Sequence, residues 1–260
     1  MPELVEVETY RALAEAALDR TIGAVRAPDA WYLKSGTTAA ALADALVGHR
    51  FVEARRIGKL LLLDVDGGPT LGLHFGMGGR LVVDGRVSID RLVYTTAAPR
   101  PEHDRFGVDF VDGGSLLVRD PRRLGAVVLA PDEARLGPDA ATIALAGLRE
   151  VLATGTAPLK ARLLDQSRLA GVGNLIADEV LWRASLDPRR PAASLQPAEL
   201  RRLHRHLRRT LADLGRRGGS HTGDLFEHRR PGGRCPRDGA ELERTAVGGR
   251  TTWWCPAHQR

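Results

Sequence analysis

The residues with the clearest chemical potential stand at the start of the chain, in Met1-Pro2-Glu3. Removal of an initiator Met before a small residue would leave Pro2 as a free secondary amine. An α-amino group titrates near pH ~8, so a useful fraction of it is an uncharged nucleophile at neutral pH. Amines of this kind attack carbonyl carbons and form Schiff bases, and Glu3 could supply or accept the proton that this needs. A Met-Pro start also occurs as a plain processing signal, so the pair gains weight only from the rest of the chain.

A helix followed by short strands is expected to position this pair. Residues 4–19 carry apolar groups at helical spacing after the acidic start Glu3, Glu6 and Glu8, which suits a helix N-terminus. From 20 to 130 the pattern changes to short apolar runs separated by glycine-rich turns, at 60–66, 70–75, 81–83, 92–95, 106–111, 115–119 and 126–130. Evenly spaced short strands with such turns predict an antiparallel β-sandwich.

Beyond an exposed boundary at 131–138 the chain is predicted to be helical. Helices are expected at 141–153, 158–167, 174–185 and 197–215, and residues 233–260 favour a β-hairpin with a cysteine at each end. The predicted fold class is α+β in two lobes with a cleft between them. We expect an N-terminal sandwich domain at 1–130, a linker at 131–138, a helical domain at 139–217 and a last segment with the hairpin at 218–260.

The composition is that of a globular protein with a basic C-terminal quarter. Hydrophobic residues make up 43% and charged residues 27% of the 260 positions, which is ordinary for a globular chain. No apolar run approaches the ~18 residues that a membrane span needs, and two cysteines provide no disulfide framework, so we expect a cytoplasmic, nucleoid-associated protein. Residues 201–260 hold 14 Arg and no Lys against 6 Asp and Glu, a net charge of +8. A basic segment of this kind is typical of a phosphate-binding surface, although a solvated basic surface would look the same.

Six motifs in order resemble the formamidopyrimidine-DNA glycosylase / endonuclease VIII family of base-excision repair enzymes. They are Met1–Thr9, Gly58–Leu62, His74–Gly79, Asp120–Gly125, Gly171–Glu179 and Gly249–Gln259. The resemblance spans the whole chain. It implies a helix–two-turn–helix domain and a zinc-ribbon-like hairpin in the second lobe, double-stranded DNA with damaged bases or abasic sites as the partner, and a monomer.

The resemblance gives Pro2 the role of the nucleophile at the sugar C1′ and Glu3 that of the proton-transfer group. Lys59 resembles the motif lysine that contacts phosphate beside the lesion; the alternative is a surface cation at a strand end. Only Lys34, Lys59 and Lys160 are lysines among 38 basic residues, and arginine cannot replace an amine that must give up a proton. Two of the three lysines fall in family motifs.

A flipped base leaves a void that minor-groove enzymes fill with apolar wedges and a cation. Met77, Arg122 and Leu124 match the family's three void-filling positions, although Phe is usual at the third. Core packing is the alternative for Met77 and Leu124. For His74, a phosphate contact and a structural histidine are equally good interpretations.

Residues 158–185 resemble the family's helix–two-turn–helix element. We expect its glycine turn to let the backbone approach phosphate and the following helix N-terminus to bind an anion. Lys160 and Asn174 are the side chains expected to contact the DNA backbone, and Glu179 is expected to be structural.

The hairpin departs from the family pattern of two Cys-x-x-Cys knuckles. Its knuckles end in Asp238 and His258, so the predicted ligands of one zinc ion are Cys235, Asp238, Cys255 and His258. The alternative is a zincless hairpin held by Trp253 and Trp254. Arg250 matches the finger arginine that grips the phosphates flanking the lesion.

The predicted function is a bifunctional DNA glycosylase and abasic-site lyase acting on oxidised bases. A non-catalytic damaged-DNA-binding relative is the main alternative, and an RNA-binding protein would explain the charge but not Pro2-Glu3. The segment from Arg216 to Arg234 is short compared with the purine-directed branch of the family. We therefore do not expect tight capping of 8-oxoguanine, and oxidised pyrimidines become plausible substrates.

Overall fold

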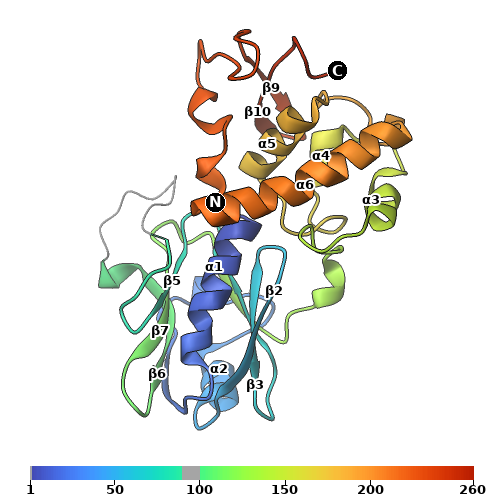
Figure 1. The fold of residues 1–260 in the computed structure, drawn as a ribbon. Coiled ribbons are helices and arrows are strands. Elements are labelled where there is room, and N and C mark those ends of the chain that lie inside the picture. Colours follow the sequence, from blue (N-terminus) through green and yellow to red (C-terminus); the bar gives the residue numbers. More distant parts are fainter. Residues whose placement is uncertain (1, 90–99) are drawn as a thin grey trace. The chain divides into compact units, whose positions relative to one another are not determined.

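The computed structural model describes residues 2–89 and 100–260, and these form two compact units (Figure 1). One unit comprises Pro2 and Glu6–Glu133, and the other comprises Glu3–Val5 and Ala134–Arg260. The division runs through the first helix, α1 (Leu4–Ala14), whose first two residues belong to the second unit.

The first unit contains two four-stranded antiparallel sheets. One has the order β1-β6-β7-β5 and the other β2-β3-β4-β8. Their bounds are β1 Ile22–Arg26, β2 Phe51–Ile57, β3 Leu60–Val65, β4 Leu71–His74, β5 Arg80–Val83, β6 Asp104–Phe110, β7 Ser115–Arg119 and β8 Ala126–Leu129. Apolar side chains from both sheets share one core, as Phe51, Leu63 and Leu73 do with Phe106 and Val118. The predicted antiparallel sandwich is therefore confirmed.

Local sequence explains most of these elements. In β7 the buried Leu116 and Val118 alternate with half-exposed neighbours, as expected for a strand with one face on a core. The predicted N-terminal helix ends earlier than expected, at Ala14, and continues as a 3-10 turn, η1 (Glu15–Ala17). Strands β1 and β2 and the helix α2 (Ala39–Leu46) were not predicted. The strand expected at 92–95 lies outside the described residues.

The second unit is helical, as predicted, with α3 (Leu145–Leu152), α4 (Leu159–Leu164), α5 (Asn174–Ala184) and α6 (Pro197–Arg217). It ends in the hairpin of β9 (Glu243–Val247) and β10 (Arg250–Trp254). A capping box of Gln196 and Glu199 starts α6, and Gly218 in the left-handed conformation ends it. The other 3-10 turns within the described residues are η2 (Ala30–Tyr32), η3 (Pro101–His103), η4 (Glu133–Arg135), η5 (Ala192–Ser194), η6 (Ser220–Thr222) and η7 (Phe226–His228).

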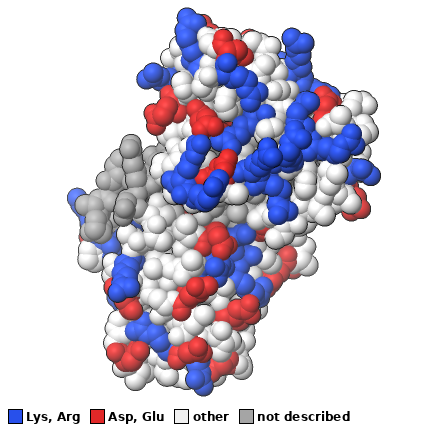
Figure 2. All heavy atoms as spheres, in the orientation of Figure 1, with Lys and Arg blue, Asp and Glu red and all other residues white. Residues whose placement is uncertain are grey.

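Much of the basic charge of the C-terminal quarter lies on α6. Its leucines are buried on one face, while Arg201, Arg205, Arg208 and Arg209 are exposed on the other. Figure 2 shows basic side chains gathered along this helix. Among the described residues, no helix has the length and apolar character that a membrane crossing requires.

Candidate functional site

The carboxylate of Glu3 lies at the N-terminus of α5, 172 residues away along the chain. Its Oε1 accepts a hydrogen bond from the Leu175 N–H at 2.8 Å, and its Oε2 accepts one from the Ile176 N–H at 3.1 Å. The first N–H groups of a helix have no partner within the helix and carry partial positive charge, so they bind a carboxylate well. Glu3 is only 1% exposed. Because each oxygen has its own donor, the carboxylate is held in one orientation directly after Pro2, which is also buried.

The glycines before α5 make room for this arrangement. A Cβ on Gly173 would lie 2.1 Å from Cδ of Glu3, and one on Gly171 would lie 2.4 Å from a methyl carbon of Leu4. Gly171 also has a φ of +111°, which side chains rarely adopt. The sequence predicts that these glycines let the backbone approach phosphate and that the helix N-terminus binds an anion. In the structure the glycines make room for Glu3 and Leu4, and the anion at this helix N-terminus is the carboxylate of Glu3.

Lys160 needs a second correction, because its side chain is buried and already paired. Its Nζ lies 2.7 Å from Oδ1 of Asp178, and neither side chain is exposed. The same ammonium donates to the Thr251 carbonyl at 3.0 Å and to Oγ1 of Thr252 at 2.8 Å. Burial lowers the pKa of Lys160, although Asp178 acts in the opposite direction. Lys160 therefore joins α4 to α5 and β10. Contrary to the prediction, its charge is enclosed and is not presented to phosphate.

Asp178 is a structural residue that the sequence reasoning missed. Besides Lys160, its carboxylate pairs with Arg229 at 2.7 Å and accepts a hydrogen bond from the Trp253 N–H at 3.3 Å. It therefore connects α4, the segment after α6 and the hairpin. An acid inside the apolar run Leu175–Trp182 was the available signal.

The neighbouring Glu179 is structural, as predicted. It accepts hydrogen bonds from the N–H groups of Asp224 at 3.0 Å and Leu225 at 2.9 Å. A Cβ on Gly223 would lie 2.6 Å from its Oε2. The short segment after α6 is thus fastened to α5 through its backbone.

Lys59 and His74 lie in the sandwich. Lys59 is the second residue of the two-residue turn between β2 and β3, after Gly58 with a φ of +58°. This turn geometry matches the strand twist and fixes where the lysine leaves the sheet. His74 ends β4 and is half-buried, and its Nδ1 accepts a hydrogen bond from the Gly76 N–H at 3.2 Å. Burial and the charge of Lys59 lower the pKa of His74, while Asp120 opposes them.

The predicted wedge residues lie on two loops that contact each other. Met77 is half-buried in the loop after β4, and Arg122 and Leu124 are exposed in the loop before β8. A Cβ on Gly76 would lie 2.3 Å from the carbonyl carbon of Leu124, so the two backbones touch there. Leu124 is 50% exposed, and core packing is therefore not its role.

The buried Asp120 shapes the second loop, and the sequence reasoning gave it no role. Its Oδ1 accepts from the N–H of Arg122 at 3.0 Å, and its Oδ2 accepts from the N–H groups of Leu124 and Gly125, both at 2.9 Å. This carboxylate replaces the hydrogen bonds that an irregular loop would otherwise lack.

Asn174 and Arg250 occupy ends of elements in the second unit. Asn174 is the first residue of α5, and its buried Oδ1 has no hydrogen-bond partner among the described residues. Arg250 is exposed and begins β10, after the two-residue turn Gly248-Gly249. A Cβ on Gly248 would lie 2.8 Å from Cβ of Ala161, so this turn packs on α4.

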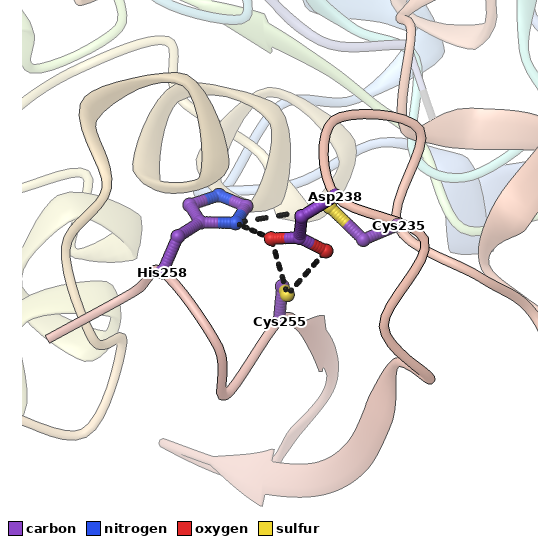
Figure 3. Close-up of side chains that lie close together, drawn as sticks. All are labelled: Cys235, Asp238, Cys255 and His258. Atoms are coloured by element: carbon purple, nitrogen blue, oxygen red, sulfur yellow. Dashed lines mark hydrogen bonds and ion pairs between the residues drawn. The ribbon is translucent and has the colours of Figure 1, made fainter.

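The four predicted metal ligands converge on one point (Figure 3). Cys235 and Asp238 come from the turn before β9, and Cys255 and His258 from the turn after β10. One ligand atom from each lies within 4.8 Å of all the others, so the group could hold a metal ion. Cys235 Sγ is 3.8 Å from His258 Nδ1. Tetrahedral zinc, with bonds of ~2.3 Å to sulfur and ~2.0 Å to nitrogen, would place these atoms about 3.5 Å apart.

Neighbouring groups also fit a metal site. Trp182 Nε1 donates to Cys235 Sγ at 3.3 Å, and His258 Nε2 lies 3.4 Å from the Trp182 carbonyl. Partners of this kind orient metal ligands in proteins. Burial raises the pKa of the Cys255 thiol to about 11, so zinc would bind there with release of a proton.

Comparison with known proteins agrees with this geometry along the whole chain. Residues 1–127 match the family model described as the formamidopyrimidine-DNA glycosylase N-terminal domain, and residues 136–224 match the formamidopyrimidine-DNA glycosylase H2TH domain. The formamidopyrimidine-DNA glycosylase of Chloroflexus aggregans is 36% identical over 282 residues, covering 100% of this chain and 98% of that protein. That of Thermus thermophilus is 37% identical over 287 residues, with the same coverage of 100% and 98%.

The fold is also similar to solved structures. The complex of the Lactococcus lactis Fpg with abasic-site-containing DNA has a TM-score of 0.83 at 28% identity and 99% coverage of each chain. A complex of a mutant of that protein with Fapy-dG-containing DNA has a TM-score of 0.84 at 28% identity and full coverage. The chain therefore belongs to the formamidopyrimidine-DNA glycosylase / endonuclease VIII family.

Proposed function

We propose that this protein is a bifunctional DNA glycosylase and abasic-site lyase that removes oxidised bases from double-stranded DNA. After removal of Met1, the Pro2 nitrogen attacks the sugar C1′, and the C1′–base bond breaks as the base leaves with a proton. Glu3 transfers the proton that opens the sugar ring, which leaves an iminium ion between Pro2 and C1′. Elimination of the 3′ phosphate and then of the 5′ phosphate follows.

The single observation that carries this proposal is the position of the Glu3 carboxylate. General acid–base catalysis requires a carboxylate held at a fixed place relative to the reacting atoms. Each carboxylate oxygen of Glu3 accepts a hydrogen bond from one helix N–H group, and the residue is bonded directly to the proposed nucleophile, Pro2. A buried carboxylate used only for structure would not need to neighbour an amine.

Side chains on the two contacting loops support the handling of a flipped base. We propose that Met77, Arg122 and Leu124 fill the void in the duplex, because an exposed leucine and an arginine beside it match an apolar wedge with a cation. We also propose that Lys59, His74, Asn174 and Arg250 contact the DNA backbone. The solved complexes of the similar Lactococcus lactis protein contain DNA with an abasic site or Fapy-dG.

We propose that one zinc ion is held by Cys235, Asp238, Cys255 and His258. The ion would have a structural role there, because it would hold the two turns of the hairpin together. With those turns fixed, the strand register keeps Arg250 opposite Val247 at the tip of the hairpin. Arg250 would then be presented to DNA in one direction.

We propose that the range of bases removed depends on the segment after α6, from Arg216 to Arg234. Glu179 of α5 accepts hydrogen bonds from the backbone N–H groups of Asp224 and Leu225 in this segment. We propose that the short segment, fastened to α5, closes less fully over a flipped base and admits oxidised pyrimidines as well as purines.

Trapping with borohydride tests the function directly. The reagent should reduce the iminium ion and join the protein covalently to abasic-site DNA, with the adduct on the peptide that begins at Pro2. Retention of Met1 in the intact mass, or undiminished trapping after the terminal amine is blocked, would contradict the assignment. A panel of duplexes with one oxidised base each would then define the substrates.

A further inference from the structure

Trp31 is a large aromatic side chain that the fold leaves in solvent. It is 66% exposed, whereas Trp182, Trp253 and Trp254 are 6%, 8% and 4% exposed. It lies in η2, where its N–H donates to Oδ1 of the preceding Asp29 at 3.2 Å. Tryptophan is usually mostly buried, because a wet indole forgoes a large gain from burial. The ring is therefore available to a binding partner.

A lysine orients this ring. Nζ of Lys34 lies 3.9 Å from the centre of the Trp31 ring, which is a cation–π contact. The Lys34 backbone N–H donates to the Val127 carbonyl at 3.0 Å and so fixes the lysine to β8. The Trp31–Lys34 pair thus combines an aromatic surface with a positive charge.

The segment with the Trp31–Lys34 pair is hydrogen-bonded to the loop that carries Arg122 and Leu124. Arg123 of that loop binds Asp29 through two hydrogen bonds of 2.7 Å, and the Arg123 guanidinium holds the pKa of Asp29 below its usual range. Tyr32, directly after Trp31, reaches Asp120 with its hydroxyl at 3.4 Å. Gly125 also lies close against Tyr32, because a Cβ there would be 2.0 Å from the Tyr32 hydroxyl.

We propose that Trp31 and Lys34 form a DNA contact next to the loop 120–125, here called the wedge loop. In this contact the indole packs on a nucleotide and the ammonium binds a neighbouring phosphate. The inference rests on the proposed function, since it requires that the wedge loop contacts DNA. The positive charge around Trp31 fits a nucleic acid better than a protein partner. The segments 29–34 and 120–125 expose two large apolar side chains, Trp31 and Leu124, among Lys34, Arg122 and Arg123. Aromatic surfaces interleaved with cations are typical of nucleic-acid contacts.

Quenching of tryptophan fluorescence by acrylamide tests the contact, because one of the four tryptophans is exposed. Acrylamide is uncharged, so DNA does not repel it. In the full chain, a saturating duplex with a tetrahydrofuran abasic-site analogue should remove most of the quenching, and Trp31→Phe should abolish this difference. Equal quenching of Trp31 with and without DNA would overturn the proposal.

Affinity measurements give an independent test. Trp31→Ala should weaken binding of the same duplex about tenfold, as expected for loss of one aromatic–nucleotide contact. Trp31→Phe keeps an aromatic ring and should stay within about threefold of the wild type, a smaller loss than one such contact. Val111→Ala is the control, because Val111 is 71% exposed and lies at the β6–β7 turn. A loss for Trp31→Ala no larger than for Val111→Ala would contradict the proposal.

The role of Lys34 has its own measurement. Lys34→Gln should reduce the slope of log affinity against log salt by about one, because one phosphate contact is lost. An unchanged slope would overturn the assignment of the ammonium. Borohydride trapping with the wild-type protein separates the two hypotheses: trapping without protection of Trp31 rejects only this contact, while protection without trapping rejects only the catalytic assignment.

Discussion

Lys160 and Asp178 form an ion pair of 2.7 Å in which neither side chain is exposed to solvent. Such a pair is costly to bury and costlier to break, because a single charge left inside a protein has lost its water without gaining a partner. The pair joins α4 to α5, and its other contacts reach β10 and Arg229. It is therefore part of the framework of the second unit.

Lys160→Ala should accordingly destabilise the protein by about 3 kcal/mol, as for other broken buried pairs. Denaturant unfolding measures this. Arg201→Ala, on the exposed face of α6, is the control and should change stability by less than about 0.5 kcal/mol. If Lys160→Ala left stability intact and only weakened DNA binding, Lys160 would be a phosphate contact and not part of the framework.

Glu3→Gln should reduce base removal far more than DNA binding. The amide keeps the shape of the side chain but cannot transfer a proton, and general acid–base groups contribute about 10²- to 10⁴-fold to rate. Single-turnover excision and binding to a tetrahydrofuran duplex give the two readouts. Glu15→Gln, in an exposed position after α1, is the control. Equal losses of excision and binding would instead indicate that Glu3 acts only on structure.

Gly173→Ala should disturb the site by steric overlap alone. The added Cβ would meet the Glu3 side chain at 2.1 Å, so Glu3 must leave its place on α5. Excision should fall together with stability. Gly215→Ala is the matched control, because Gly215 is helical and a Cβ there meets nothing within 4 Å. That change should stabilise the protein by about 0.5–1 kcal/mol. Full activity of Gly173→Ala would show that the position of Glu3 is not needed.

His74 should make the protein less stable in acid. Burial and Lys59 lower its pKa in the folded state, so the unfolded chain binds the proton more tightly. The stability that the neutral ring contributes is complete above the unfolded pKa of ~6.5 and is lost as pH falls below it. Unfolding free energies at pH 8, 6 and 5 for the wild type and His74→Gln measure this. The wild type should lose more stability than the variant, and parallel curves would refute the assignment.

Removal of zinc should loosen the hairpin. Metal analysis of protein purified without added zinc should give about one ion per chain, as for a four-ligand structural site. Chelation or Cys235→Ser should then weaken DNA binding, because Arg250 would lose its fixed direction. Asp238→Cys should keep the metal. A metal content near zero with DNA binding indifferent to chelator would support a zincless hairpin held by Trp253 and Trp254.

Elements with local sequence signals could be predicted from the chain alone. The alternation in β7 and the leucine face and caps of α6 depend on residues a few positions apart, and both elements lie where predicted. Local signals were missing where an element is irregular. Strands β1 and β2 each contain a register shift that breaks the alternation, and α2 is an eight-residue helix inside a region of strands. The ordered motifs were enough to predict the family and the convergence of the metal ligands.

The partners of the polar groups in those motifs depend on contacts between distant segments and could not be predicted from the sequence. Glu3 and Leu175 of α5 are 172 positions apart, and no local pattern predicts that the anion at this helix N-terminus is a carboxylate of the same chain. Lysine is usually an exposed residue, but the packing of α4 on α5 and β10 encloses Lys160 with Asp178. The difference is physical: periodicity reports which side of an element is apolar, whereas the partner of a buried charge depends on which distant segments pack around it.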